Sequence, residues 1–158
     1  MATRNVETQV QELLDREAIR DLPLRYCHAV WTRDLEGMVN LFTEDGAIWI
    51  KGREDVKTQG RENLRKMYGG VMVENGPRPF IHNHVINLDA PDRATGTCYL
   101  EIRQTRDDKS WIAAGYYNDE YAKVGDQWKF KSRQVTMYYS APLLEGWAER
   151  AAKRAKSG

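Results

Sequence analysis

Residues 80–139 read FIHNHVINLDAPDRATGTCYLEIRQTRDDKSWIAAGYYNDEYAKVGDQWKFKSRQVTMYY. Four segments of this stretch are rich in apolar, aromatic and β-branched side chains, as strands are: 80–88, 94–103, 111–122 and 128–139. The breaks between them are short and contain turn-forming residues such as Asp, Gly and Pro. Short turns join antiparallel neighbours, so the stretch predicts a four-stranded antiparallel meander.

Helices are expected before these strands. Apolar residues recur every three or four positions over residues 6–31, which indicates an amphipathic helix, and Pro23 predicts a kink or a two-piece helix there. A short second helix follows Asp34, an N-cap residue, and a strand at 47–52 precedes a third helix at 60–68. A basic amphipathic helix is expected at 143–156. This order predicts an α+β fold in which helices cover the concave face of a curved antiparallel sheet, giving a cone.

The composition excludes several classes of function. The 158 residues hold 24 Lys and Arg against 23 Asp and Glu, so the charge balance gives no reason to expect nucleic acid or an anionic membrane as a partner. No apolar run is long enough to span a membrane and the first residues are polar, so we expect a soluble, cytoplasmic protein. The chain has no glycine-rich phosphate loop, no Gly-x-Ser-x-Gly and no Cys-x-x-Cys, and we expect chemistry without a cofactor.

Two histidines, His82 and His84, are the most informative residues for chemistry. Residues two apart share a face of a strand, and this face also carries Phe80, so both imidazoles are expected to point into apolar surroundings. There a histidine serves as a general acid or base, because its pKa lies near neutral pH. The alternative is a hydrogen-bonded pair in the core. A His-x-His strand can also bind a metal, but no further ligands accompany it, and we expect no metal.

Several stretches together resemble a known family. They are REAIRDL (16–22), RY (25–26), Asp34, LFTEDG (41–46), ATGTCYLE (94–101), GYYNDEY (115–121) and WKF (128–130). In this order and spacing they resemble the nuclear-transport-factor-2-like superfamily, with its cystatin-like fold. The branch they resemble is the SnoaL-like one, which includes scytalone dehydratase, bile-acid 7α-dehydratase and a hexachlorocyclohexane dehydrochlorinase. The resemblance implies one domain over residues 1–158.

The resemblance also implies site residues. Dehydratases of this branch have a catalytic histidine on the strand of residues 80–88, and His82 is the nearest counterpart, although a count without gaps places the family position at Pro79 or Phe80. The partner aspartate of that histidine falls at Trp31, which cannot replace a carboxylate, so the family's His-Asp dyad does not carry over. Asp34 is the nearest acid, with an N-cap as its alternative role. Tyr26 matches a family tyrosine that can hydrogen-bond a substrate oxygen.

The rest of the pocket is expected to be aromatic. His28 lies three residues before Trp31 and is expected to share its helical side, so that a third imidazole joins the candidate catalytic residues if that side faces the pocket. Besides Trp31, the side chains expected to contact substrate are Trp49, Phe80 and Tyr138. Wide, flat side chains suit a small apolar molecule, aromatic or polycyclic.

We therefore expect a cofactor-independent lyase or isomerase, dehydratase-like or retro-aldol-like, acting on such a molecule. A non-catalytic small-molecule-binding protein, or a small enzyme subunit, is the alternative. The outer sheet face, with Tyr99 and Tyr117 expected on it, predicts a homo-oligomer. By resemblance it is a trimer, with a dimer as the alternative.

Overall fold

The structure is a computed structural model that describes residues 5–143. In these residues the helices are α1 (Val6–Thr32), α2 (Leu35–Asn40), α3 (Arg61–Val71) and a 3-10 turn, η1 (Glu54–Val56). The strands are β1 (Phe42–Ile50), β2 (Thr58–Gln59), β3 (Arg78–Ala90), β4 (Arg93–Arg106), β5 (Lys109–Val124) and β6 (Gln127–Pro142). Apart from Leu143, the helix expected at 143–156 lies outside the described residues. None of the described helices is long and apolar enough to cross a membrane.

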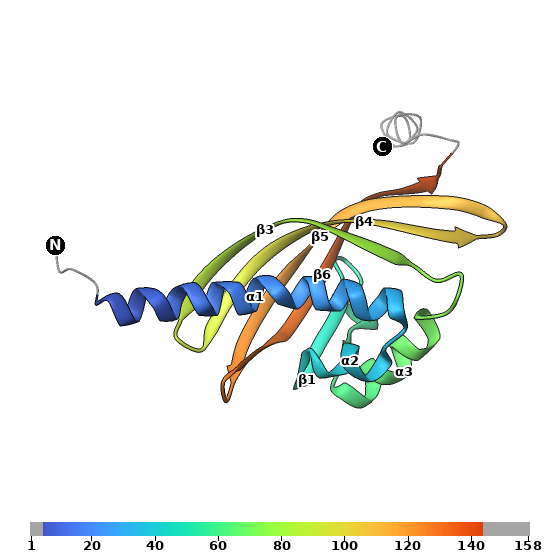
Figure 1. The fold of residues 1–158 in the computed structure, drawn as a ribbon. Coiled ribbons are helices and arrows are strands. Elements are labelled where there is room, and N and C mark those ends of the chain that lie inside the picture. Colours follow the sequence, from blue (N-terminus) through green and yellow to red (C-terminus); the bar gives the residue numbers. More distant parts are fainter. Residues whose placement is uncertain (1–4, 144–158) are drawn as a thin grey trace.

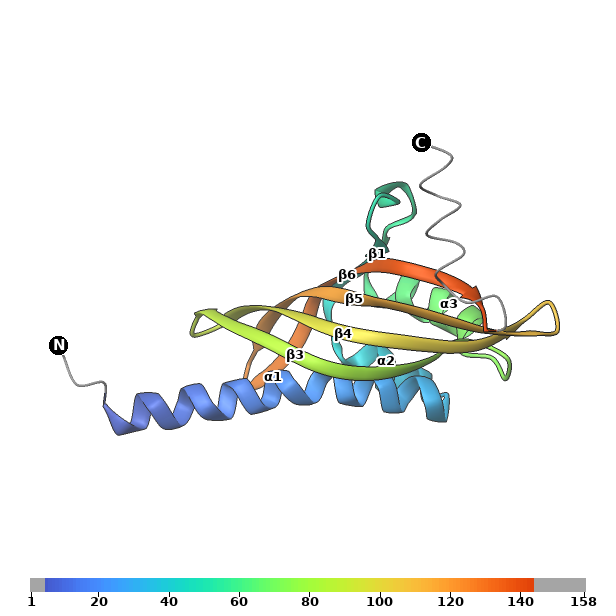
Figure 2. The ribbon, with the colours of Figure 1, turned by 90° about the horizontal axis from the view of Figure 1, so that it is seen from above.

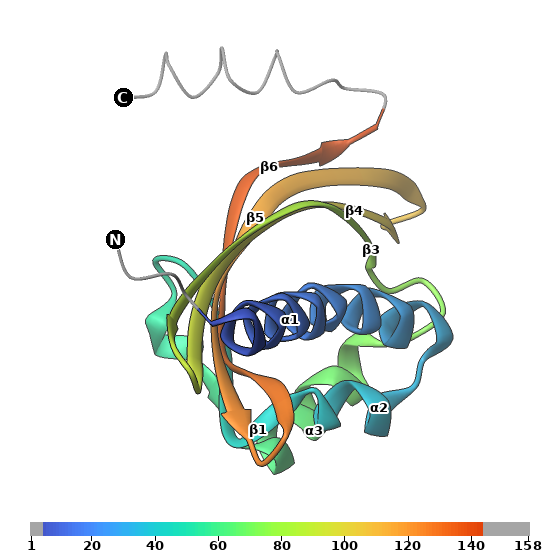
Figure 3. The ribbon, with the colours of Figure 1, turned by 60° about the vertical axis from the view of Figure 1, so that its left-hand side comes forward.

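The six strands form one curved, unclosed sheet in the order β2-β1-β6-β5-β4-β3 (Figure 1). Strands β3 to β6 pair antiparallel in chain order, which confirms the predicted meander. Strand β1 pairs in parallel with β6, which makes the sheet mixed rather than purely antiparallel. The sheet arches over α1, while α2 and α3 lie beyond that helix on the open side (Figure 3). The α+β cone with helices on the concave face is thus confirmed.

Helix α1 is continuous through Pro23, so the expected break is absent. Its first buried residue is Asp15, and the turns before it extend past the end of the sheet (Figure 2). Asp15 accepts hydrogen bonds of 2.8 Å from both Lys123 Nζ and Trp128 Nε1, and Arg16 donates one of 2.9 Å to the Ile86 carbonyl. These contacts fasten the helix to β3, β5 and β6 from residue 15 onward.

Side chains on the concave face alternate with those on the outer face, as pleated strands require. On β5 the buried residues include Tyr117, Asp119 and Tyr121. Tyr117 was expected on the outer face, and this expectation is wrong. It pairs with Cys98, which is fully buried, and directly opposed residues of antiparallel strands point to the same side.

Candidate functional site

A buried ion pair lies on the concave face of the sheet. Asp119 on β5 faces Arg133 on β6, and its carboxylate accepts hydrogen bonds of 2.8 Å from Arg133 Nε and 3.0 Å from Nη2. Both side chains are 0% exposed. Removing two charges from water is costly, and a bidentate geometry is one of the arrangements that offset the cost. An ion pair this deep is a candidate for function as well as for structure.

Aromatic rings enclose the Arg133 guanidinium. Its central carbon lies 3.7 Å from the ring centre of Tyr117, 4.1 Å from that of Phe130 and 4.3 Å from that of Tyr26. Burial lowers the pKa of Arg133, but the Asp119 carboxylate and the Tyr117 and Tyr26 hydroxyls together raise it further than burial lowers it, so the group stays charged. Arg133 Nη1 is buried and has no hydrogen-bond partner in the described chain. A charged N–H group is therefore left unpaired in an aromatic interior.

His84 on β3 joins this network through Tyr121. Its Nε2 lies 2.9 Å from the Tyr121 hydroxyl, which in turn donates a 2.9 Å hydrogen bond to Asp119. Because the phenol has one O–H group and donates it to the carboxylate as a hydrogen bond, His84 Nε2 must be the donor to the phenol oxygen. This assignment, made from the network, leaves a lone pair on Nδ1. That atom is buried and has no partner among the described residues.

The imidazole of His84 is neutral at physiological pH. Burial, reinforced by the positive charges of Arg133 and Arg20, lowers the pKa of His84 to about 4. Protonation is therefore confined to acidic solution, and Nδ1 is available to accept a proton at neutral pH.

Phenol groups complete the cluster. The Tyr68 hydroxyl of α3 donates a 3.1 Å hydrogen bond to the Tyr26 hydroxyl of α1, and the Tyr26 ring packs edge-on against Tyr117 at 5.8 Å between centres. Burial raises the pKa values of Tyr68 and Tyr117 well above the usual range, so both phenols keep their protons. We call His84, Tyr121, Asp119, Arg133, Tyr26, Tyr68 and Tyr117 the interior cluster.

The interior cluster has the parts needed for acid–base chemistry. His84 Nδ1 can accept a proton, and Arg133 Nη1 can stabilise negative charge that develops on a substrate oxygen. No three or more His, Cys, Asp or Glu side chains are grouped so as to hold a metal ion within residues 5–143.

His82 lies on the opposite side of β3 from His84. The pairing of β3 with β4 shifts between Ile81 and His84, and a bulge of this kind interrupts the alternation of faces. The His82 side chain is 50% exposed, and its Nε2 lies 3.9 Å from a carboxylate oxygen of Glu101. The expectation that both imidazoles point inward is wrong for His82, which leaves His84 as the candidate base.

The positions that the resemblance assigns to the family's catalytic histidine and aspartate lie in contact in the structure. Pro79 or Phe80 occupies the first, and Trp31 occupies the second. Trp31 Nε1 donates a 2.8 Å hydrogen bond to the Pro79 carbonyl, and the Trp31 ring packs edge-on against Phe80 at 5.3 Å. Trp31 and Phe80 were expected to contact substrate in an interior pocket. Both are exposed, so this expectation is wrong.

Three more predicted residues lie away from the interior cluster. His28 is exposed, because the buried stripe of α1 passes through Tyr26 and Ala29 instead. Asp34 accepts a 2.9 Å hydrogen bond from the Gly37 N–H and is the N-cap of α2, which confirms its alternative role. Tyr138 is 77% exposed and does not belong to the interior cluster.

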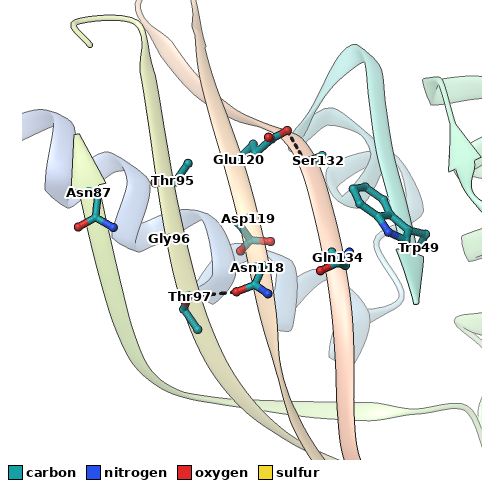
Figure 4. A pocket seen from close by; sticks show the side chains of 10 residues that line it. All are labelled: Trp49, Asn87, Thr95, Gly96, Thr97, Asn118, Asp119, Glu120, Ser132 and Gln134. Carbon is teal, nitrogen blue, oxygen red and sulfur yellow. Dashed lines mark hydrogen bonds between the residues drawn. The ribbon is translucent and has the colours of Figure 1, made fainter. Parts of the chain in front are cut away.

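Trp49 lines a separate groove of about 340 Å³ on the outer face of the sheet, where α1 lies behind the strands (Figure 4). The groove is polar: Thr97 donates to Asn118, and Ser132 donates to Glu120. Trp49 was predicted to contact substrate in the pocket, but it lies outside the interior cluster.

Sequence reasoning missed Asp119, Tyr121 and Arg133. Strand alternation places Asp119 on the same face as Tyr117 and Tyr121, and a carboxylate between two aromatic side chains is a signal that could have identified it. Nothing in the local sequence marks Arg133 as its partner.

The sequence matches a family model, and the fold matches solved structures. Residues 11–134 match the family model described as a SnoaL-like domain. No curated protein sequence matches the chain.

Solved structures resemble the chain over most of its length. A variant of Rv3472, a protein of unknown function from Mycobacterium tuberculosis, is 28% identical, with 87% of this chain and 78% of that chain covered and a TM-score of 0.70. A candidate scytalone dehydratase from Novosphingobium aromaticivorans is 22% identical, with 85% and 91% covered and a TM-score of 0.76. The hexachlorocyclohexane dehydrochlorinase LinA-type3 from Novosphingobium barchaimii is 20% identical, with 85% and 94% covered and a TM-score of 0.76. The last two similarities concern the fold alone.

Proposed function

Because the chain belongs to the SnoaL-like domain family, we propose that it is a cofactor-independent lyase or isomerase that acts on a small apolar, aromatic molecule. One observation carries the proposal: the interior cluster holds a buried imidazole nitrogen and a buried guanidinium nitrogen, both without a partner in the described chain. Buried polar atoms are nearly always paired, so two unpaired ones with complementary chemistry favour a ligand that pairs them.

The proposed roles follow from protonation. His84 Nδ1 removes a proton from a carbon next to a carbonyl or an activated ring, and Arg133 Nη1 stabilises the enolate oxygen that forms. In a dehydration the electron pair of the broken C–H bond forms the double bond, and the imidazolium returns its proton to the departing hydroxyl as water. In a retro-aldol cleavage the imidazole instead takes the proton of the substrate hydroxyl, and the C–C bond breaks to release an aldehyde and leave an enolate. The imidazolium then returns its proton to the enolate carbon. Tyr26 assists in this proposal as a hydrogen-bond donor to a substrate oxygen.

A non-catalytic binding protein, or a small enzyme subunit, is the second candidate. Two departures from the family favour it: Trp31 stands where the resemblance places the catalytic aspartate, and Pro79 or Phe80 stands where a count without gaps places the catalytic histidine. In that case the interior cluster binds a ligand and no proton is transferred.

We also propose that the protein forms a homo-oligomer through its outer sheet face, a trimer, with a dimer as the alternative. Exposed Tyr99 and Tyr138 support this.

Replacing His84 separates the two functions. In H84Q the amide nitrogen can still donate to Tyr121, but no side-chain atom can accept a proton from carbon. We expect wild type to exchange C–H protons of ring-bearing β-hydroxy ketones in D2O, or to release water or an aldehyde from them, as read by mass spectrometry. H84Q should be slower by about 10²–10⁴-fold.

The matched control is H82Q, which changes an exposed histidine on the same strand and should leave the rate unchanged. A loss of less than about threefold in H84Q would eliminate the catalytic role. Equal ligand binding by both variants, with no turnover in wild type, would favour the second candidate.

A further inference from the structure

A second hollow is lined by residues from the end of α1, the loop before β3 and the strands at the β4–β5 hairpin. Figure 1 shows these segments at the same end of the molecule. Its volume is about 350 Å³, and its lining includes Trp31, Arg78, Phe80, Arg103 and Trp111. We call it the end groove. It shares no residue with the interior cluster, so it is a different site.

The aromatic walls of the end groove are fixed before any ligand arrives. Trp31 is held by its hydrogen bond to the Pro79 carbonyl and by edge-on packing against Phe80 at 5.3 Å. Both rings nevertheless remain exposed, Trp31 at 45% and Phe80 at 40%. Large side chains that are rigid, exposed and adjacent in a concave place are typical of a ligand site, since flat rings then need little reordering to bind.

Positive charge borders these rings. The central carbon of Arg78 lies 5.9 Å from the Trp31 ring centre, and that of Arg103 lies 5.7 Å from the Phe80 ring centre. The Arg78 guanidinium donates to backbone carbonyls such as those of Val73 and Gly76, which do not neutralise its charge.

Carboxylates compensate these charges only in part. Within residues 5–143, no carboxylate lies at ion-pair distance from Arg78, while Arg103 has Glu101 at 3.9 Å. Glu101 is shared with His82, and Glu74 lies in the groove lining. The end groove therefore combines exposed aromatic faces with guanidinium groups that retain positive charge.

We propose that the end groove binds a planar aromatic carboxylate. The ring of the ligand packs among Trp31, Phe80 and Trp111, and its carboxylate pairs with Arg103, whose planar fork matches that geometry. The site is separate from the proposed reaction centre, because a ligand here does not contact His84.

Calorimetric titration of the full chain tests this with two probes, 2-naphthoate and the neutral 2-naphthylmethanol. We expect the carboxylate to bind at least about fivefold more tightly than the alcohol, and this preference to weaken at high salt. R103Q should remove the preference, and W31L should weaken the binding of both probes. R93Q is the matched control: it removes an exposed arginine that also has one carboxylate near 4 Å, but at the other end of the sheet, and it should change nothing.

Four results would contradict the proposal: no binding of either probe, equal binding of the two, an unchanged preference in R103Q, or unchanged affinities in W31L. An apparent affinity that falls as protein concentration rises would mean that a second copy of the chain occupies the groove, which also overturns the proposal. H84Q should bind both probes as wild type does, so failure of the proposed reaction and failure of this site are distinguishable.

Discussion

Asp119 controls the protonation of its neighbours at the scale of single residues. It accepts one hydrogen bond from the Tyr121 hydroxyl and two from Arg133. Tyr121 must then accept from His84, which frees Nδ1. One carboxylate thus holds a charged donor in place and, through a phenol, selects the tautomer of the candidate base.

Replacing Asp119 should be costly for that reason. D119N leaves the Arg133 charge buried without compensation, and we expect the free energy of unfolding to fall by about 3–5 kcal/mol in urea denaturation. E120Q is the control, because Glu120 is adjacent but exposed on the outer face. It should cost less than about 1 kcal/mol. If D119N and E120Q lose the same free energy of unfolding, the buried ion pair does not contribute more to stability than a surface carboxylate does.

At the scale of elements, two strand irregularities decide which side chains meet. The β5–β6 hairpin pairs Tyr121 with Phe130, and continuing that register would place Asp119 opposite Ser132. The register shifts by one residue between Glu120 and Tyr121, so that Asp119 faces Arg133 instead. The bulge in β3 likewise separates His82 from His84.

The strands could be predicted from sequence because turn residues mark their ends, whereas the bulges could not. The local sequences IHNH (81–84) and FKSR (130–133) contain no signal for the extra residue of a bulge, because a bulge is selected by packing on both faces of the sheet. Helical periodicity correctly predicted that Tyr26 lies on the buried side of α1. The periodicity holds because the helix continues through Pro23. The parallel pairing of β1 was unpredictable, because it joins residues more than 80 apart in the chain.

The attachment of α1 makes a prediction at the scale of elements. Asp15 is buried and accepts from Lys123 and Trp128 at once. D15A removes their shared acceptor, and we expect a loss of about 2 kcal/mol in urea denaturation together with faster hydrogen exchange along α1.

E17A serves as the comparison for D15A, since Glu17 is exposed and pairs with Arg20 at the surface. It should stay within about 0.5 kcal/mol of wild type. If E17A costs as much as D15A, the contacts of Asp15 do not anchor the helix.

At the scale of the whole molecule, helices cover one sheet face and leave the other open in the described chain (Figure 3). Its exposed side chains include Tyr99, which packs against Tyr116 at 5.8 Å, and Tyr138. The polar groove of Figure 4 lies on the same face of the sheet. Apolar and hydrogen-bonding groups are thus mixed on this face, as they are in many subunit interfaces.

Sedimentation equilibrium at micromolar concentration tests the proposed assembly. We expect about three times the chain mass of 18.3 kDa, and Y99E with Y138E should reduce it by placing charge in the interface. A stable species of the single-chain mass in wild type would mean that the outer face is in contact with water.

The protonation state of His84 is the most direct test of the account, because both proposed reactions need its free Nδ1 lone pair. Nitrogen-15 NMR of the imidazole, titrated from pH 3 to 8 and assigned with H84Q, measures it without any substrate. We predict a neutral ring with the proton on Nε2 at neutral pH, becoming doubly protonated only as the pH falls through about 4. A proton on Nδ1 at neutral pH, or an imidazolium at pH 7, would contradict the assignment of His84 as the base.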